Sequence, residues 1–287
     1  MKDTSGLSLQ TLSRPSVLGG VLGAFLIVSA VALSTNHFIA FFSLEGLMIV
    51  IGGVMAVAFM SFHANDVHEA LRAIRNMFRE ASATHDNLHH DMADILAWAR
   101  IVREKGMRGL ESNIGRHGVD DPFVNYGLNM VISDYTPEEI RSMMETAADA
   151  YYERDSVPAQ VLQAMASHAP AFGMVGTLVG MVTMLYNLGD NVTGIGASLA
   201  VSFLSTLYGV VTARMIYMPA AAKLTQKLDS QRFRNQLITE GMVMLVSNKS
   251  SIYIQDRLNS FLRPEIHDSL NTAAYDRTVQ KLQVIRT

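Results

Sequence analysis

Residues 168–182 read HAPAFGMVGTLVGMV, a segment that contains no Asp, Glu, Lys or Arg and is apolar enough for a lipid bilayer. On a helix, its glycines and its threonine fall on one connected face, made by Gly173, Gly176, Thr177 and Gly180. Glycines four residues apart let two helix backbones approach closely in a membrane. The segment therefore predicts a membrane helix with a notched face that carries a hydroxyl group.

Apolar stretches of this kind recur along the chain, at residues 15–34, 40–62, 170–187 and 195–219. Each is long enough for a helix to cross about 30 Å of hydrocarbon. The first exceeds the usual signal-peptide core of about 7–15 residues, so we expect it to be a span and not a cleaved signal. The second stretch contains one charged residue, Glu45, and the last contains only Arg214. Four transmembrane helices are predicted.

The orientation follows from the basic residues. Residues 35–39 and 188–194 contain no Lys or Arg, whereas ten lie between residues 63 and 169 and ten follow residue 220. Because basic residues concentrate on the cytoplasmic side of membrane proteins, this distribution places both termini and the long middle segment in the cytoplasm.

The fold is predicted to be all-α, an integral membrane protein with four transmembrane helices and a helical cytoplasmic domain. In the middle segment, Thr136 is the expected N-cap of a helix that begins at Pro137, and VDDPF around Asp121 is the expected turn. The predicted segments are a cytoplasmic N-terminus (1–14), a first hairpin (15–62), the cytoplasmic domain (63–169), a second hairpin (170–219), a C-terminal helix (220–262) and a tail (263–287).

The composition excludes several classes of function. The chain has no cysteine, which excludes disulfides, thiol catalysis and cysteine-based metal sites. Its net charge of −3 gives no reason to expect a nucleic-acid partner. No P-loop, GxSxG elbow or catalytic triad is apparent, so we expect no enzyme activity, and no cofactor beyond a transported ion. His85 and His89 have metal-ligand spacing but are interpreted as surface residues of a helix, and no metal site is predicted.

The last apolar stretch repeats the small polar face of the first segment quoted. Its stripe consists of Ser198, Ser202, Ser205, Gly209 and Thr212, with Thr206 beside it. One interpretation is helix packing, with each hydroxyl bonded to its own backbone. The other is a polar lane for a small cation or its water. Neither helix carries a carboxylate at mid-depth, so a conducting protein would need one from a partner chain.

Two prolines, Pro170 and Pro219, stand at the predicted cytoplasmic ends of these last two spans. Proline is tolerated in a first helical turn or near a helix end. Their matched depth also allows a second interpretation, in which they are hinges that carry a membrane event into the cytoplasmic domain.

The chain resembles the A subunits of bacterial flagellar stators, the MotA/PomA family, with a closer likeness to the PomA-like branch. PAFGMVGTLVGM (170–181) and IGASLAVSFLSTLYGVVTARMIYMPAAAKL (195–224) are similar to the last two membrane helices of that family. ExbB and TolQ are its wider relatives. The segment REKGMRGLE (103–111) is similar to the stator cytoplasmic loop and narrows the resemblance to flagellar stators.

The resemblance implies a multi-pass protein of the bacterial inner membrane. Five copies would form a ring around two copies of a single-span MotB/PomB-type B subunit, whose aspartate binds the translocated ion. Ion flow would turn this homopentamer and drive the rotor protein FliG, making flagellar rotation and chemotaxis possible.

The resemblance also assigns residues. It implies that Pro170 and Pro219 are coupling prolines. It places Arg103 and Glu111 at the rotor contact, with Lys105 and Arg108 nearby. The ion path would include Thr177, Ser202, Ser205 and Thr206, and Gly173, Gly176, Gly180 and Gly209 would pack the helices.

Departures from the family leave the ion open between Na⁺ and H⁺. Ser205 stands where PomA-like chains often have threonine, and Arg214 and the outer loop GDNVTG are unexpected. The alternatives are an ExbB/TolQ-like energiser of a trans-envelope complex and a membrane scaffold that conducts nothing.

Overall fold

The computed structural model describes residues 14–34, 41–77, 84–117, 120–189, 192–247 and 249–261. All regular structure in these ranges is helical, as predicted. The chain forms two compact units. The first comprises Met1–Ser82 with Glu153–Asp229, and the second comprises Ala83–Tyr152 with Ser230–Thr287. Helices α7 (Pro137–Tyr186) and α9 (Met218–Val246) contribute to both units.

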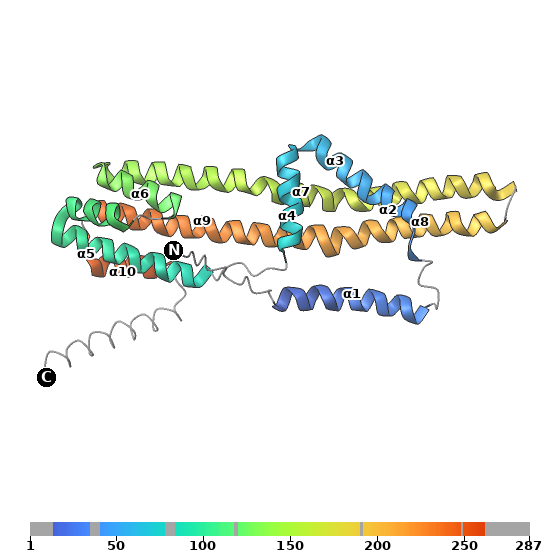
Figure 1. Cartoon of the computed structure of the whole chain (residues 1–287), viewed down its shortest axis with the longest axis horizontal. Coiled ribbons are helices and arrows are strands. Elements are labelled where there is room, and N and C mark those ends of the chain that lie inside the picture. Colours follow the sequence, from blue (N-terminus) through green and yellow to red (C-terminus); the bar gives the residue numbers. More distant parts are fainter. Residues whose placement is uncertain are drawn as a thin grey trace, which may run out of the picture. The chain divides into compact units, whose positions relative to one another are not determined.

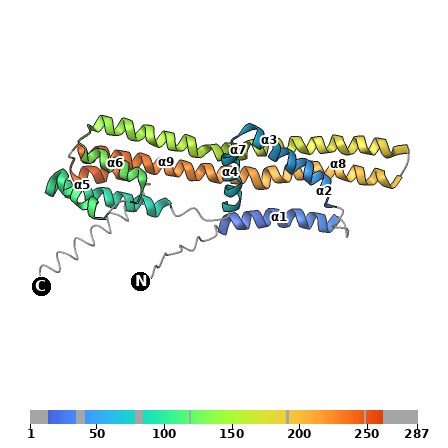
Figure 2. The same ribbon diagram turned by 45° about the horizontal axis from the view of Figure 1, so that its top comes forward.

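The first unit is built on the pairing of α7 with α8 (Val192–Thr212), which Figures 1 and 2 show running side by side. A short 3₁₀ turn, η3 (Asn187–Gly189), follows α7. The remaining elements of this unit are α1 (Arg14–Ser34), α2 (Leu44–Leu47), the π-helix η2 (Met48–Gly52), α3 (Gly53–Ser61), α4 (Ala64–Asn76) and the π-helix η4 (Ala213–Tyr217).

Three described helical segments are long and apolar enough to cross a membrane. They are Leu44–Ser61, part of Pro137–Tyr186 and part of Ile195–Val246, and they correspond to the second, third and fourth predicted spans. Within α1 the apolar run Leu18–Leu33 is shorter. The structure therefore confirms a helical protein with several membrane-capable helices, and the count of four spans stays a prediction.

Pro170 and Pro219 are predicted to stand at the cytoplasmic ends of two membrane spans, which stays a prediction, but neither proline ends a helix. Pro170 lies inside α7, and the helical segment Ile195–Val246 continues through Pro219. The predicted segment borders at 169/170 and 219/220 therefore fall within continuous helices.

The prediction of one continuous C-terminal helix over residues 220–262 is wrong. Helix α9 ends at Val246, and a separate helix α10 (Ser251–Asn259) begins after a turn. Ser250 causes the new start, because its side chain accepts a hydrogen bond from the amide of Tyr253 and caps α10. The predicted N-terminus (1–13) and tail (263–287) lie outside the described residues.

The second unit contains α5 (Thr84–His117), α6 (Pro122–Ile132), α10 and the adjoining parts of α7 and α9. Asp121 caps α6 through hydrogen bonds from the amides of Phe123 and Val124, and Thr136 and Glu139 form a capping box at the start of α7. The helix start at Pro137 was predicted, whereas around Asp121 only a turn was predicted. The core of this unit includes Ile95, Leu110, Leu128, Ile140, Met144, Leu237 and Met242.

An ion-pair cluster joins three segments of the second unit. Arg234 of α9 contacts Asp91 of α5 at 2.5 and 2.7 Å and Asp121 at 2.5 Å. Burial raises the pKa of Asp121, but the hydrogen bonds from Arg234 and from two backbone amides outweigh it and lower the pKa overall. A second pair, Arg141 with Glu240 at 2.5 Å, likewise lowers the pKa of Glu240 through its hydrogen bond.

Candidate functional site

The predicted notches bring α7 and α8 into backbone contact. A Cβ atom added to Gly209 would lie 2.5 Å from the carbonyl oxygen of Ala169, and one added to Gly180 would lie 2.7 Å from that of Ser198. At Gly173 the corresponding distance to the carbonyl oxygen of Ser205 is 3.0 Å. No side chain fits at these points without a shift of backbone, so the glycines set the separation of the two helices.

Thr177 and Thr206 meet across this contact, with 2.6 Å between their hydroxyl oxygens. The Thr177 hydroxyl also lies 3.1 Å from the carbonyl oxygens of Gly173 and Ser202, and the Thr206 hydroxyl lies 3.3 Å from that of Gly173. Four oxygen atoms therefore gather in an otherwise apolar pair of helices. Thr206 is exposed and Thr177 is half-buried, so this threonine pair is accessible from outside the folded chain.

Ser202 and Ser205 have a different environment. They are 1 % and 0 % exposed. The hydroxyl of Ser205 donates to the carbonyl of Val201 at 2.7 Å, and that of Ser202 lies within hydrogen-bond distance of the carbonyls of Ser198 and Thr177. The four residues predicted to line one ion path thus separate into an accessible threonine pair and a buried serine pair.

The segment α2–η2–α3 covers the serine side of the α7–α8 pair. A Cβ atom on Gly46 would lie 2.8 Å from the hydroxyl oxygen of Ser205, and one on Gly53 would lie 2.2 Å from the ring of Phe172. A Cβ on Gly176 would lie 2.5 Å from the Ser205 hydroxyl oxygen. The contacts of Gly46 and Gly176 explain why Ser205 is buried, and Gly180, where a Cβ atom would meet the Ser202 hydroxyl oxygen, does the same for Ser202.

Sequence reasoning missed Tyr208, which fastens this covering segment to α8. Its hydroxyl donates to the carbonyl of Phe41 at 2.6 Å and accepts from the amide of Ser43 at 2.9 Å. Ser43 is in turn the N-cap of α2. A tyrosine in an apolar span needs a partner for its hydroxyl, which was the available signal, although its partners could not be read from the sequence.

The two charged residues of the apolar spans lie outside the α7–α8 contact. Glu45 is exposed in the first turn of α2, and Arg214 is exposed on η4. Neither forms a salt bridge with another of the described residues.

The backbone around Pro219 contains a π-helical turn. In η4, the amide of Met218 donates to the carbonyl of Ala213, five residues earlier. Proline has no amide hydrogen, and its ring crowds the carbonyl four residues before it, so a wider turn at this point relieves the clash. Pro170 lies beside the tight contact that Gly209 makes with Ala169.

The charged motif predicted to contact a rotor lies on both sides of a kink in α5. Gly106 has φ 68° and ψ −175°, a backbone conformation that residues with a Cβ atom rarely adopt. Arg103 and Lys105 precede the kink, and Arg108 and Glu111 follow it. All four side chains are exposed, and none forms a salt bridge within the described parts of the chain.

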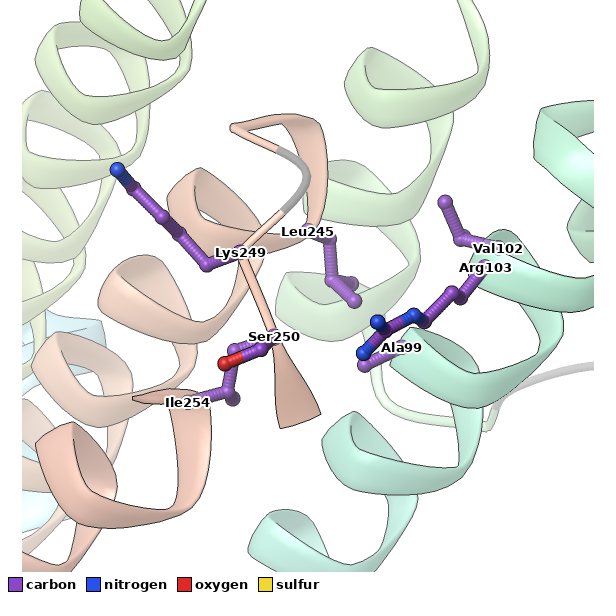
Figure 3. Close-up of a pocket in the computed structure, with 7 residues that line it drawn as sticks. All are labelled: Ala99, Val102, Arg103, Leu245, Lys249, Ser250 and Ile254. Atoms are coloured by element: carbon purple, nitrogen blue, oxygen red, sulfur yellow. The ribbon is translucent and has the colours of Figure 1, made fainter. Parts of the chain in front are cut away.

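Arg103 also borders a pocket of about 150 Å³ (Figure 3). The buried side chains Ala99, Val102, Leu245 and Ile254 form its apolar part, and Lys249 and Ser250 complete its lining. The guanidinium of Arg103 reaches from α5 toward Leu245 (Figure 3).

Comparison with known proteins gives a consistent result. Residues 116–236 match the MotA/TolQ/ExbB proton channel family. The chain is 32 % identical to the uncharacterized protein YtxD of Bacillus subtilis over 246 residues, which are 85 % of this chain and 88 % of that protein. It is 28 % identical to Motility protein A of Borreliella burgdorferi, covering 91 % of this chain and 98 % of that protein. It is 27 % identical to chemotaxis protein PomA of Vibrio alginolyticus, and the match covers 86 % of this chain and 94 % of that protein.

Solved structures agree with these relatives. The flagellar MotAB stator complex from Bacillus subtilis has a chain with a TM-score of 0.75 and 25 % identity, and the match covers 89 % of this chain and 98 % of that one. The MotAB structure from C. jejuni has a similar fold, with a TM-score of 0.78 at 22 % identity over 88 % of this chain and 97 % of that one.

Proposed function

The chain belongs to the MotA/TolQ/ExbB proton channel family, and we propose that it is the A-type subunit of a flagellar stator, coupling cation flow across the inner membrane to rotation. It is a multi-pass membrane protein and an ion-channel subunit, not an enzyme. The observation that carries the proposal is the threonine pair, Thr177 and Thr206, at an accessible edge of a tightly packed membrane hairpin.

The threonine pair implies a partner chain. Four oxygens beside an apolar surface can replace part of the hydration of a small cation or order a water, but they carry no negative charge. An acidic side chain inside a membrane is costly and is kept for function, and none lies beside this pair in sequence. A single-span MotB/PomB-type subunit that presents a carboxylate to Thr177 and Thr206 supplies the missing charge.

The ion path in this proposal is narrower than the predicted stripe. Thr177 and Thr206 face the partner and the moving ion, whereas Ser202 and Ser205 pack α7 against α8 and α2. The burial of both serines and the saturation of their hydroxyls by carbonyls support this division. The ion is Na⁺ or H⁺, since hydroxyl oxygens suit either a hard cation or a proton-carrying water.

The proposed assembly is a ring of five copies around two B subunits, with both termini in the cytoplasm. Its cytoplasmic charged motif pushes the rotor protein FliG through Arg103, Lys105, Arg108 and Glu111. The exposure of these side chains supports that contact, because they are free of internal salt bridges among the described residues. Pro170 and Pro219 act in this proposal within continuous helices and not at their ends.

The test is to co-express the chain with the MotB/PomB-type B subunit encoded beside it, in a flagellated strain that lacks stators. Swimming speed is measured against external Na⁺ at fixed pH. A speed that rises with Na⁺ supports a sodium-driven stator, and swimming that ignores Na⁺ but stops with a protonophore supports a proton-driven one. A complex that assembles with the B subunit but never restores swimming would contradict the stator function and favour an ExbB/TolQ-like energiser.

A further inference from the structure

The pocket beside Arg103 is smaller than a typical small-molecule site. Its volume is about 150 Å³, whereas pockets for small molecules usually measure about 300–1,000 Å³. An engineered cavity of about 150 Å³ holds a benzene molecule. The pocket therefore has room for one amino-acid side chain.

Its lining indicates the charge of that side chain. Arg103 borders the pocket from α5, and Lys249 borders it from the turn before α10 (Figure 3). None of the seven described lining residues is acidic. The start of α10 lies at the same rim, where the helix dipole also favours negative charge. The chemistry of the rim fits a carboxylate.

Arg103 and Lys249 differ in how readily each can bind an incoming carboxylate. Arg103 is exposed and has no salt bridge to another residue within the described ranges. The ammonium of Lys249 lies 5.5 Å from the ring centroid of Tyr253 and points away from Arg103 (Figure 3). An exposed cation–π contact is worth only about 0.5–1 kcal/mol, so the flexible lysine can turn toward a bound anion.

The floor of the pocket adds an apolar contact. Leu245 and Ile254 are 2 % and 1 % exposed, and Ala99 and Val102 are both 7 % exposed. The methylene groups of an inserted glutamate or aspartate would lie against these side chains while its carboxylate remained at the basic rim. A carboxylate bound by two cations and a desolvated floor is held more specifically than one at an open surface.

We propose that this pocket receives one acidic side chain of the rotor protein, and that Lys249 and the apolar floor share the binding with Arg103. This inference rests on the proposed stator function. It adds a socket, built where α5, α9 and α10 meet, to a contact otherwise assigned to exposed charges on α5 alone.

The first test measures recruitment of the fluorescently tagged full chain to motors, with its B subunit present. Lys249→Glu reverses one rim charge, and Ala99→Leu fills the floor while both cations remain. Each should reduce recruitment by about tenfold, as loss of about 1.4 kcal/mol would. Arg100→Glu is the matched control, because Arg100 is exposed on the same helix but does not line the pocket. It should leave recruitment within about twofold of the unaltered chain.

The outcomes separate this inference from the proposed function. If Arg103→Glu abolishes recruitment while Lys249→Glu and Ala99→Leu do not change it, the surface contact stands and the socket is refuted. If Arg103→Glu also has no effect, the proposed rotor contact fails as well.

A second measurement does not depend on how the filled variant folds. The chain contains no cysteine, so Lys249→Cys and Arg100→Cys each introduce a unique thiol. In the purified stator complex, a saturating excess of rotor protein, which offsets the loss of the Lys249 ammonium, should slow maleimide labelling at position 249 and leave the labelling rate at position 100 unchanged. Equal rates at position 249 with and without rotor protein would overturn the proposal. So would the same protection by inorganic phosphate alone, since the site would then bind a free anion.

Discussion

The α7–α8 contact of the first unit and the α5–α6–α9 contact of the second are held by different chemistry. In the first, Gly180 and Gly209 bring backbones together, and the polar groups are hydroxyls that bond to carbonyls. In the second, Arg234 joins Asp91 and Asp121, and large apolar side chains fill the core. A membrane hairpin gains little from burying apolar surface and depends on close backbone packing, whereas the second unit combines burial with ion pairs.

The largest effect should come from filling a notch. Gly209→Val places a branched side chain against the backbone of Ala169, which cannot move without shifting α7. Overpacking of this kind costs about 3 kcal/mol at the upper end. We expect a large fall in the thermal midpoint of the purified complex and loss of swimming.

A matched glycine distinguishes packing from loss of glycine itself. A Cβ atom at Gly196 would meet nothing within 4 Å. Gly196→Val should therefore keep the midpoint close to that of the unaltered protein. Equal destabilisation by both variants would contradict the account of the notches.

In the second unit, Arg234→Met should cost about 2 kcal/mol. It leaves Asp91 and Asp121 as uncompensated, partly buried charges, and partial exposure reduces the penalty of a fully buried pair. Limited proteolysis of the second unit should become faster. Adding Asp91→Asn and Asp121→Asn to the same chain should recover part of the loss, and failure to recover any of it would show that the charges are not the cause.

Asp121 should also give this unit a dependence on pH. Its folded-state pKa is lowered, so its contribution is complete above the unfolded value of about 3.9 and is lost as pH falls through the folded value. The unaltered complex should therefore lose stability in acid below about pH 4. A melting series should show a smaller loss for Asp121→Asn over the same range.

Gly106→Ala should have a smaller effect on stability, about 1 kcal/mol, because alanine is strained at φ 68°. The kink sets the direction of Arg108 and Glu111 relative to Arg103, so rotor recruitment should fall more than stability does. Gly52→Ala is the control, since a Cβ there meets nothing within 4 Å. If the Gly106→Ala chain is recruited to motors as well as the unaltered chain, the kink does not position the charged motif.

Periodicity and capping chemistry predicted much of this fold. Thr136 caps the helix that begins at Pro137 through a local hydrogen bond, which needs no tertiary contact. The stripes of small residues predicted that α7 and α8 meet. These features depend on residues close in sequence, and local physics is sufficient for them.

Other features depend on partners distant in sequence, and the sequence could not supply them. A stripe indicates a face of a helix but not what covers it, so Ser205 and Thr206 looked equivalent until Gly46 was found against one of them. The π-helical turn before Pro219 likewise could not be predicted, because no local residue pattern marks it. Lys249 and Arg103 are far apart in the chain, and only folding places them at one pocket.

The central claim is that the threonine pair serves the ion and the serine pair serves the packing. The most direct measurement compares two double variants for swimming in the stator-less strain, each with the B subunit and with membrane levels matched. Thr177→Val with Thr206→Val keeps the shape of the helices and removes both accessible hydroxyls, so it should abolish swimming. Ser202→Ala with Ser205→Ala removes the buried hydroxyls and should leave most of the speed. If the threonine variant swims normally, or if only the serine variant stops, the assignment of the ion path is contradicted.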